Sequence, residues 1–525
     1  MAFVHVDEEE EDTMESDSDY EPILNWNLFH DRETDGPAAN SRRSYILLVL
    51  QNLVGRGLME CEDNGYARKL PKICGKQNME KLQTNDIYRS VMNASGFKLN
   101  PRQPWNVTKL LDERQRLNAW SASQKNKING LFVPNMKERV AMKYDSKVFC
   151  GTFTPNGKHF VTACQEGEIR VYDSTTSAYK HVNTLMGRDV EWSILDIGFT
   201  ADGQEFVYAT RSCCLHVGKT HGRTSDITCI PFEECNIHKF ASYSVLFANG
   251  DKEIIAGCSD GAVSVFDRES NTWTERAFED NMEVNAVRMI EDNSPVVLAA
   301  SDDGIIRIYD RRSMASKTRG SMGIFVGHLD GVTSIDVKND GRYFITNSKD
   351  QTIKLWDMRV TSRESQIQNF AAVKRDAFRE WDYRWNSVPT SYYKITELTG
   401  DTSVMSYRGH RVFKSLLRAK FSPVHTTGQR YIYTGCGTGY LVIYDVLTGE
   451  MVQALRGHSG IVRDVAWHPN RQEILTSSWD CNVNLYSYKA DVWKQEAKKT
   501  RIQNIALRRS ARIANRIRSN NSDNT

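Results

Sequence analysis

Short runs of alternating apolar and polar residues fill most of the chain, from about Val148 to Tyr488. The runs are bounded by Asp, Gly, Ser and Asn, the residues that favour turns. Alternation at every second position is typical of strands with one buried face, whereas helices repeat every three to four residues. The pattern therefore predicts an all-β domain over residues 145–488, built of many short strands.

Internal repetition indicates how these strands are arranged. Several segments share a Ser or Cys, a turn, an apolar stretch and a terminal aromatic-Asp pair: Cys164–Asp173, Cys258–Asp267, Ser301–Asp310 and Ser348–Asp357, with weaker copies at Cys436–Asp445 and Ser478–Ser487. Gly-His dipeptides at 327–328, 409–410 and 457–458 open the later units. A period of roughly forty residues with Gly-His and Trp-Asp marks is the signature of WD-repeat propeller blades.

The spacing of the repeats predicts the number of blades. Asp267, Asp310 and Asp357 lie one repeat apart, and the interval from Asp173 to Asp267 holds two repeats. We therefore expect a degenerate blade around residues 189–218 and seven blades in all. Residues 360–408 lack alternation, so we expect an inserted loop there, between blades five and six.

Four polar or aromatic residues of the best-preserved repeat have spacing suited to a buried network. They are His328, Ser348, Asp350 and Trp356. We expect a relay in which the Asp orients the His and the Ser hydroxyl accepts a hydrogen bond from the indole N–H. Such a network ties the strands of one blade together. We therefore interpret these residues as structural and not as a catalytic pair.

The N-terminal part of the chain differs from the repeats. Residues 1–40 carry ten acidic side chains between positions 7 and 21, with too few apolar groups to offset chain entropy, and we expect disorder. Over residues 41–60, apolar residues recur at helical spacing until two glycines end the pattern, which predicts a short amphipathic helix. Residues 61–140 are polar and broken by prolines, so we expect an irregular extension with a few short helices.

A basic tail follows the repeats, over residues 489–525. Between positions 494 and 518 it carries nine basic residues and one acid. Its arginines include Arg508, Arg509, Arg512, Arg516 and Arg518. Basic tails of this kind serve nuclear import or bind nucleic acid. No aromatic residue interleaves the arginines from position 501 on, so we favour import and expect no direct nucleic-acid binding; a solvated tail without function is the alternative.

Composition excludes several classes of protein. The 525 residues include 68 basic and 66 acidic side chains, and this near balance is not typical of proteins that coat nucleic acid. The start lacks the features of a secretory signal, and no apolar run approaches the roughly 20 residues needed to span a membrane. We therefore expect a protein of the nucleus and cytoplasm with no membrane partner.

The 11 cysteines, including the pair Cys213-Cys214, have no spacing suited to zinc, so we expect reduced thiols, no metal and no cofactor.

The blade itself does not require any particular residue two places beyond each terminal Asp. These residues are Thr175, Glu269, Arg312, Arg359, Leu447 and Lys489. Arginine therefore occurs in two adjacent repeats, in Tyr309-Asp310-Arg311-Arg312 and Trp356-Asp357-Met358-Arg359. A guanidinium at a strand end suits bidentate contacts with the carboxylates or carbonyls of a partner. We expect both arginines on one face of the rim. The alternative is that they lie on a solvated rim and bind no partner.

Trp-Asp-x-Arg at the end of a blade resembles the docking motif of WD-repeat substrate receptors for cullin-4 RING ubiquitin ligases. Four further stretches are similar to one family of these receptors, the cullin-4-associated factor eleven family, also called WD-repeat protein twenty-three: Asn347–Asp357, Trp381–Trp385, Tyr407–His410 and Arg463–Pro469. The resemblance covers residues 145–488 and, less closely, the helix at 45–59. One repeat departs from the motif, because Tyr309 stands where the motif has Trp.

The resemblance implies a non-catalytic receptor subunit. It would dock on the ligase adaptor, the larger subunit of the damaged-DNA-binding complex, and hold a target for ubiquitination and proteasomal degradation. The implied adaptor contacts are Tyr309, Asp310, Arg312, Trp356, Asp357 and Arg359 at the rim and Ile46, Leu50, Leu53, Val54 and Leu58 in the helix. In animals the family is associated with turnover of a cap-n-collar basic-zipper stress transcription factor.

Two other functions fit parts of the sequence. A WD-repeat scaffold of a nuclear RNA-processing or chromatin assembly would use the basic tail. An enzyme would need titratable groups that converge in the central channel, and the sequence identifies none. Gly435–Gly439 resembles a nucleotide-binding loop but lacks the Lys-Ser/Thr of a P-loop, so we interpret it as a turn.

The insert contains one more match to the docking motif, Trp381-Asp382-Tyr383-Arg384. No apolar strand precedes it, so we do not expect it to dock the adaptor. We expect a plug over the propeller, and a contact with the substrate is the alternative.

Overall fold

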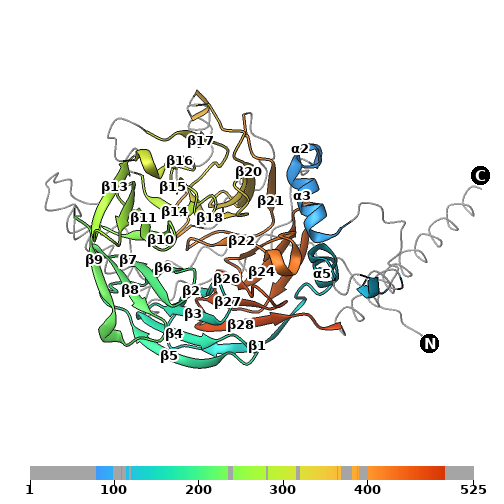
Figure 1. The fold of residues 1–525 in the computed structure, drawn as a ribbon, viewed down its shortest axis with the longest axis horizontal. Coiled ribbons are helices and arrows are strands. Elements are labelled where there is room, and N and C mark those ends of the chain that lie inside the picture. Colours follow the sequence, from blue (N-terminus) through green and yellow to red (C-terminus); the bar gives the residue numbers. More distant parts are fainter. Residues whose placement is uncertain are drawn as a thin grey trace, which may run out of the picture. The chain divides into compact units, whose positions relative to one another are not determined.

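The structure is a computed structural model that describes residues 79–97, 108, 111, 114–116 and 120–490, with gaps at 234–239, 279–281, 315–319, 364, 368–380, 387 and 389–399. Its strands form seven sheets of four antiparallel strands each. The sheets surround a common centre (Figure 1). The prediction of a seven-bladed propeller is confirmed, including the degenerate second blade.

The blades follow one another along the chain, and the first strand of each lies beside the first strand of the next. Blade one holds β2 Val148–Phe153, β3 His159–Cys164, β4 Glu168–Asp173 and β5 Lys180–Met186; blade two holds β6 Ile194–Phe199, β7 Glu205–Thr210, β8 Cys214–Lys219 and β9 Thr228–Pro231. Blade three holds β10 Ser242–Ala248, β11 Glu253–Cys258, β12 Ala262–Asp267 and β13 Thr272–Phe278; blade four holds β14 Val284–Met289, β15 Val296–Ser301, β16 Ile306–Asp310 and β17 Gly323–Phe325. Blade five holds β18 Val332–Val337, β19 Tyr343–Ser348, β20 Thr352–Asp357 and β21 Met405–Arg408; blade six holds β22 Ala419–Phe421, β23 Tyr431–Gly435, β24 Tyr440–Asp445 and β25 Met451–Arg456.

The seventh blade closes the ring with a strand from the other end of the domain. Strands β26 Val462–Trp467, β27 Ile474–Ser478 and β28 Asn482–Ser487 are joined by β1 Met136–Lys143, which pairs antiparallel with β28. The predicted start of the domain at residue 145 is therefore wrong, because β1 begins at Met136, within the segment expected to be irregular. As an outer strand, β1 is mostly half-exposed and its apolar pattern is weak. This pairing of the two ends of the domain closes the ring, because a strand from before the first blade completes the last one.

The insert lies inside blade five and not between blades five and six, as the sequence analysis had placed it. Strand β21, at the end of the insert, pairs with β20 from Thr352↔Arg408 to Leu355↔Met405. It is the fourth and outermost strand of its blade. Four residues are too few to show a clear period in the sequence, so the strand was included in the predicted loop.

Short helices before the propeller pack against its edge. They are α2 Met79–Thr84, α3 Asp86–Ser95 and α5 Ala122–Asn129, and the one-turn helix α7 Val424–Thr427 follows β22. Leu82, Ile87 and Val91 are fully buried in one cluster with apolar residues of blades five and six. Short 3-10 turns occur at η3 Thr224–Asp226 and η4 Arg311–Ser313. None of the described helices is long and apolar enough to cross a membrane.

A close backbone approach joins this helical segment to blade six. Gly428, which ends α7, has a φ of +64°, and a Cβ added there would lie 2.6 Å from the carbonyl carbon of Ala94 in α3. Asn126 of α5 donates to the carbonyl oxygens of Ala94 and Val424, at 3.0 and 3.1 Å. The helices are therefore part of the same packed unit as the propeller.

Candidate functional site

The two predicted arginines follow the third strands of neighbouring blades. Asp310 ends β16 and is followed two residues later by Arg312, and Asp357 ends β20 and is followed by Arg359. Equivalent ends of equivalent strands in a propeller lie on one face. We call the four residues Asp310, Arg312, Asp357 and Arg359 the Asp–Arg face.

In blade five a buried carboxylate holds an exposed guanidinium. Asp357 Oδ1 accepts from the backbone N–H and the Nε of Arg359, both at 3.1 Å, and Asp357 Oδ2 accepts from Nη2 at 2.9 Å. The Asp357 side chain is fully buried, whereas that of Arg359 is 57% exposed. The fork is therefore fixed in direction without being covered, which lowers the entropy that a partner must remove to bind it.

Blade four repeats this geometry. Asp310 Oδ1 accepts from the backbone N–H and the Nε of Arg312, both at 3.0 Å, and Asp310 Oδ2 accepts from Nη2 at 2.7 Å. The hydrogen bonds from Arg312 hold the pKa of Asp310 below its usual value. The Arg312 side chain is 69% exposed. In both blades the Nη1 group has no hydrogen-bond partner among the described residues, so each arginine presents donors to solvent.

The same tight turn occurs in other blades without an arginine. The backbone N–H groups of Thr175, Glu269 and Leu447 donate to the Asp two residues before, at 2.8 to 2.9 Å. The turn is therefore shared by blades one and three to six, because an Asp side chain readily caps the backbone two residues on. Among these five blades, blades four and five are the two with an arginine at that position, as the sequence had indicated.

The α2–α3 segment adds a feature that the sequence analysis missed at the Asp–Arg face. Asn85 caps α3 by accepting from the Ile87 N–H at 3.1 Å, and its Nδ2 donates to Asp357 at 3.2 Å. Asp86 pairs with Arg342 at 2.8 Å and contacts Arg359 at 3.5 Å. Asn85 followed by apolar residues at 87, 88 and 91 is a helix-start signal that could have been recognised. The helix buttresses the carboxylate that orients Arg359.

A third Asp–Arg pair lies on the other face. Arg384 binds Asp382 through its backbone N–H, its Nε and Nη2, at 2.8 to 3.2 Å, as in the two rim motifs. The neighbouring Tyr383 accepts at its carbonyl from the Lys414 N–H, and Lys349 Nζ lies 3.9 Å from its ring centroid. Lys349 belongs to the β19–β20 turn, at the opposite end of β20 from Asp357. The insert thus brings this segment to the face away from the Asp–Arg face.

The structural relay of blade five uses a different hydroxyl from the one expected. His328 Nδ1 lies 2.9 Å from Asp350 Oδ2, while Thr346 Oγ1 lies 2.6 Å from His328 Nε2 and accepts from Trp356 Nε1 at 2.8 Å. Ser348 donates instead to the carbonyl of Asp330 and accepts from the Asp350 N–H. The prediction that Ser348 satisfies the indole is therefore wrong. Thr346 and Trp356 lie on neighbouring paired strands and point to the same side, which spacing in the sequence does not show.

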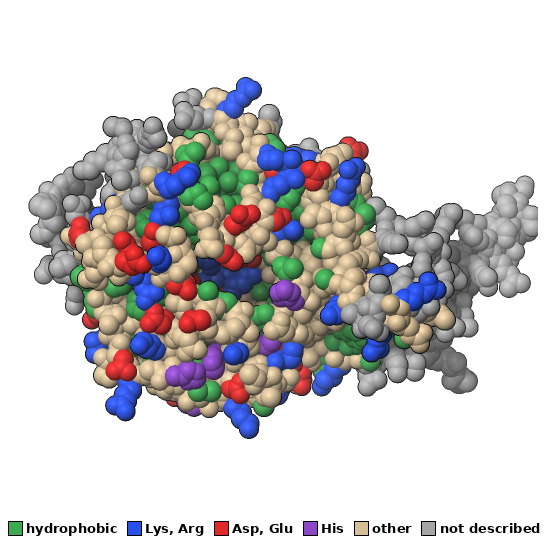
Figure 2. All heavy atoms as spheres, in the orientation of Figure 1, with side chains coloured by type: hydrophobic (Ala, Val, Ile, Leu, Met, Phe, Trp, Pro, Cys, Tyr) green, Lys and Arg blue, Asp and Glu red, His purple; other side chains and the backbone are tan. Residues whose placement is uncertain are grey.

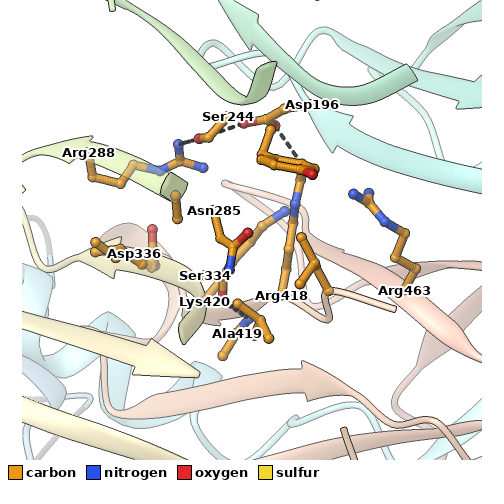
Figure 3. Close-up of a pocket in the computed structure, with 15 residues that line it drawn as sticks. Asp196, Ser244, Asn285, Arg288, Ser334, Asp336, Arg418, Ala419, Lys420 and Arg463 are labelled. Atoms are coloured by element: carbon orange, nitrogen blue, oxygen red, sulfur yellow. Dashed lines mark hydrogen bonds and ion pairs between the residues drawn. The ribbon is translucent and has the colours of Figure 1, made fainter. Parts of the chain in front are cut away.

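Charged residues converge in the central channel, which opens as a hollow with basic side chains inside it (Figure 2). Its lining includes Asp196, Arg288, Asp336, Arg418, Lys420 and Arg463 from the inner edges of blades two and four to seven (Figure 3). Arg418 pairs with Asp196 at 2.7 Å and with Asp464 at 3.0 Å, and Lys420 pairs with Asp464 at 2.9 Å. The sequence had identified none of these groups as neighbours.

These channel pairs do not have the protonation of a general acid or base. Burial alone would raise the pKa of Asp464, but Lys420 and Arg418 outweigh it and hold the pKa at about 2. Burial would likewise raise the pKa of Asp196, and Arg418 and Arg288 keep it below its usual value. Catalytic acids and bases work best with a pKa near the working pH. Both carboxylates are instead ionised partners that brace the inner strands against one another.

Four segments of the chain match the model of a known repeat family. The model of the family described as WD domain, G-beta repeat, matches residues 140–173, 274–310, 320–357 and 449–487. A Caenorhabditis briggsae protein named DDB1- and CUL4-associated factor 11 homolog is 33% identical over 399 residues, which are 73% of this chain and 71% of the relative. The chain belongs to the DDB1- and CUL4-associated factor 11 family. The resemblance inferred from the sequence is therefore confirmed.

Two further relatives have a comparable sequence identity to this chain. A Caenorhabditis elegans protein with the same name is 37% identical over 369 residues, 68% of this chain. The match spans 63% of that relative, so this chain covers less than two thirds of its length. The LEC14B protein of Lithospermum erythrorhizon is 33% identical over 362 residues, 67% of this chain and 75% of the relative. Two of the repeat matches end at the motif residues Asp310 and Asp357.

Some of the residues that the sequence predicted for binding or import lie outside the described part of this protein. They are Ile46, Leu50, Leu53, Val54 and Leu58 of the docking helix and Arg508, Arg509, Arg512, Arg516 and Arg518 of the tail. The acidic segment 1–40 also lies outside it. Their proposed roles remain predictions.

Proposed function

We propose that this protein is a substrate receptor of a cullin-4 RING ubiquitin ligase and that it docks on the ligase adaptor through the Asp–Arg face. Family membership supports the class of function, since relatives are named as associated with DDB1 and CUL4. The observation that carries the docking site is the pair of exposed arginines, each held by its own Asp, at equivalent places in adjacent blades. The helix at residues 41–60 would complete the contact.

The chemistry of the two arginines suits a protein partner. Each uses Nε and one Nη group on its own Asp and keeps the opposite edge of the guanidinium for acceptors of the partner. Tyr309 and Trp356 are buried beneath the motifs, at 5% and 0% exposure, so they act by supporting the strand ends. Replacement of Trp by Tyr in blade four therefore leaves the surface arrangement of Asp310 and Arg312 unchanged.

The opposite face is proposed to hold the target. It carries Trp381–Asn386 of the insert, which is tied to blades five and six through Lys349 and Lys414. A receptor with its adaptor on one face and its target on the other brings target lysines close to the conjugating enzyme, which raises their effective concentration. Transfer itself is carried out by other subunits.

Finer parts of the proposal rest on the family resemblance. The target is proposed to be a cap-n-collar basic-zipper stress transcription factor, degraded by the proteasome after ubiquitination. The protein is proposed to act in the nucleus and cytoplasm, with the basic tail serving import. Abundance of such a factor after depletion of this protein tests the first point, and the location of a tail-deleted form tests the second.

Co-purification tests the docking proposal. The tagged full chain, the Arg312→Ala/Arg359→Ala variant and an Arg384→Ala control are recovered from cells and analysed by quantitative mass spectrometry. Arg384 is matched because it has the same Asp-held geometry on the other face. We expect the adaptor with wild type and with the control, and its loss with the double variant. A partner set without the adaptor, or one that depends on the tail alone, would favour a nuclear scaffold.

A further inference from the structure

Blade two brings together side chains that are far apart in the sequence. Ligand atoms of Asp189, His216 and Cys229 all lie within 4.8 Å of one another. His216 in β8 and Cys229 in β9 are direct cross-strand partners, and Asp189 precedes β6. Cys214 lies two residues before His216 on the same side of β8, and its thiol interacts with that of Cys229.

The Asp189–His216 contact differs from the relays of the other blades. His328 and His458 each bind a buried or nearly buried Asp through Nδ1 and a Thr hydroxyl through Nε2. His216 instead binds Asp189 through Nε2 at 2.8 Å, and its buried Nδ1 has no partner among the described residues. The Asp189 side chain is 59% exposed. The Nε2 atom of His216 therefore faces an exposed carboxylate and, across the hairpin, the thiol of Cys229, whereas the other two histidines face a Thr hydroxyl there.

We propose that Asp189, His216 and Cys229 bind a divalent metal ion of the zinc class. Imidazole, thiolate and carboxylate are the donors that zinc accepts in proteins, and three or four of them complete a tetrahedral site. His216 and Cys229 are placed by the register of one hairpin, so two ligands are held on a rigid element. Asp189 approaches from an exposed loop and leaves a path for the ion to enter.

Binding would change the protonation of the cluster. The metal would displace the thiol proton of Cys229 to solvent, which makes binding stronger as the pH rises. On binding, the 2.8 Å contact between Asp189 and His216 would widen to about 3.4 Å, the separation of two ligands in a tetrahedral zinc site.

Sequence spacing had predicted neither feature of this region. The interval between His216 and Cys229 is the length of a hairpin loop and matches no linear zinc motif. The expectation that all cysteines are reduced thiols is also wrong, because Cys213 is disulfide-bonded. The seven other described cysteines are free, including Cys214 and Cys229.

Cobalt titration of the full chain, purified without metal and kept anaerobic, tests the proposal. Co²⁺ is the probe because cobalt–thiolate bonds absorb strongly in the near ultraviolet and a tetrahedral site adds visible bands. The variants are Cys229→Ser, which changes an exposed side chain, and Cys481→Ser, a partly buried free thiol of blade seven, as the matched control.

We expect about one equivalent of Co²⁺ to bind wild type and Cys481→Ser with a thiolate band, and Zn²⁺ to displace it. Cys229→Ser should lose the band or bind at least about 100-fold more weakly, beyond the 10–100-fold typical of residues that only support a ligand. No cobalt–thiolate band in the wild type would overturn the proposal. A band that persists unchanged in Cys229→Ser would overturn it equally, since the metal would then sit elsewhere.

Discussion

Replacing Thr346 with Val tests the relay that holds blade five together. The substitution keeps the shape of the side chain and removes only the hydroxyl. In the structure this hydroxyl donates to His328 Nε2 and accepts from Trp356 Nε1, and Thr346 and Trp356 are fully buried, with His328 nearly so. The donor role follows from the tautomer, because the Asp350 carboxylate requires the proton on Nδ1.

The expected loss of stability follows from the two groups that lose a hydrogen-bond partner, His328 Nε2 and Trp356 Nε1. Each buried polar group left unsatisfied costs about 1–3 kcal/mol, so Thr346→Val should destabilise the protein by about 2–6 kcal/mol. The equivalent Thr476 in blade seven is a matched control. Its hydroxyl lies 2.6 Å from His458 Nε2, but that nitrogen also accepts from Asn484 Nδ2 at 2.9 Å. Thr476→Val should therefore cost only about 1 kcal/mol, the worth of one hydrogen bond.

Thermal unfolding at one fixed scan rate compares the two variants with wild type and with Ser348→Ala. At about 2 °C per kcal/mol for a domain of this size, Thr346→Val should lower the Tm by roughly 4–12 °C and Thr476→Val by roughly 2 °C. Equal shifts for the two Thr variants would refute the reasoning. A larger fall in Tm for Ser348→Ala than for Thr346→Val would indicate that Ser348, and not Thr346, completes the relay.

His410, Gly428 and Tyr383 can each be tested by one substitution. Burial lowers the pKa of His410 from 6.5 to about 4, so the contribution of the neutral imidazole to the free energy of unfolding is complete above pH 6.5 and is lost as the pH falls to 4. His410→Asn should reduce the loss of stability between these pH values by an amount on the order of 3 kcal/mol, measured by unfolding at several pH values. Gly428→Ala places a Cβ against α3 and should expose residues 79–97 to limited proteolysis while the propeller stays intact; unchanged protection would contradict the packing. Tyr383→Ala should weaken capture of the target at least about 10-fold without affecting the adaptor, and loss of both partners would contradict the assignment of opposite faces.

The sequence predicted those features that depend on residues close together along the chain. Seven blades followed from the repeat, and Arg312 and Arg359 followed from a turn of fixed length after each third strand. Strands β1 and β21 were missed because outer strands are short or half-exposed and carry little alternation.

Side chains that meet across strands could not be predicted in this way. Thr346 meets Trp356, and His216 meets Cys229, only through the register of paired strands. Likewise, Asn85 and Asp86 reach Asp357 and Arg359 from a helix more than 250 positions away. The channel cluster joins residues from blades two, six and seven for the same reason: a closed ring brings the inner strands of all blades to one centre.

The central claim is that Arg312 and Arg359 dock the ligase adaptor, and the direct measurement is the affinity of the purified full chain for the purified adaptor. Buried interface arginines often contribute 2 kcal/mol or more, so Arg312→Ala/Arg359→Ala should weaken binding at least about 100-fold, while Arg384→Ala should stay within about twofold of wild type. A double variant that is folded and binds the adaptor like wild type would contradict the account. So would an Arg384→Ala variant that loses binding to the same extent.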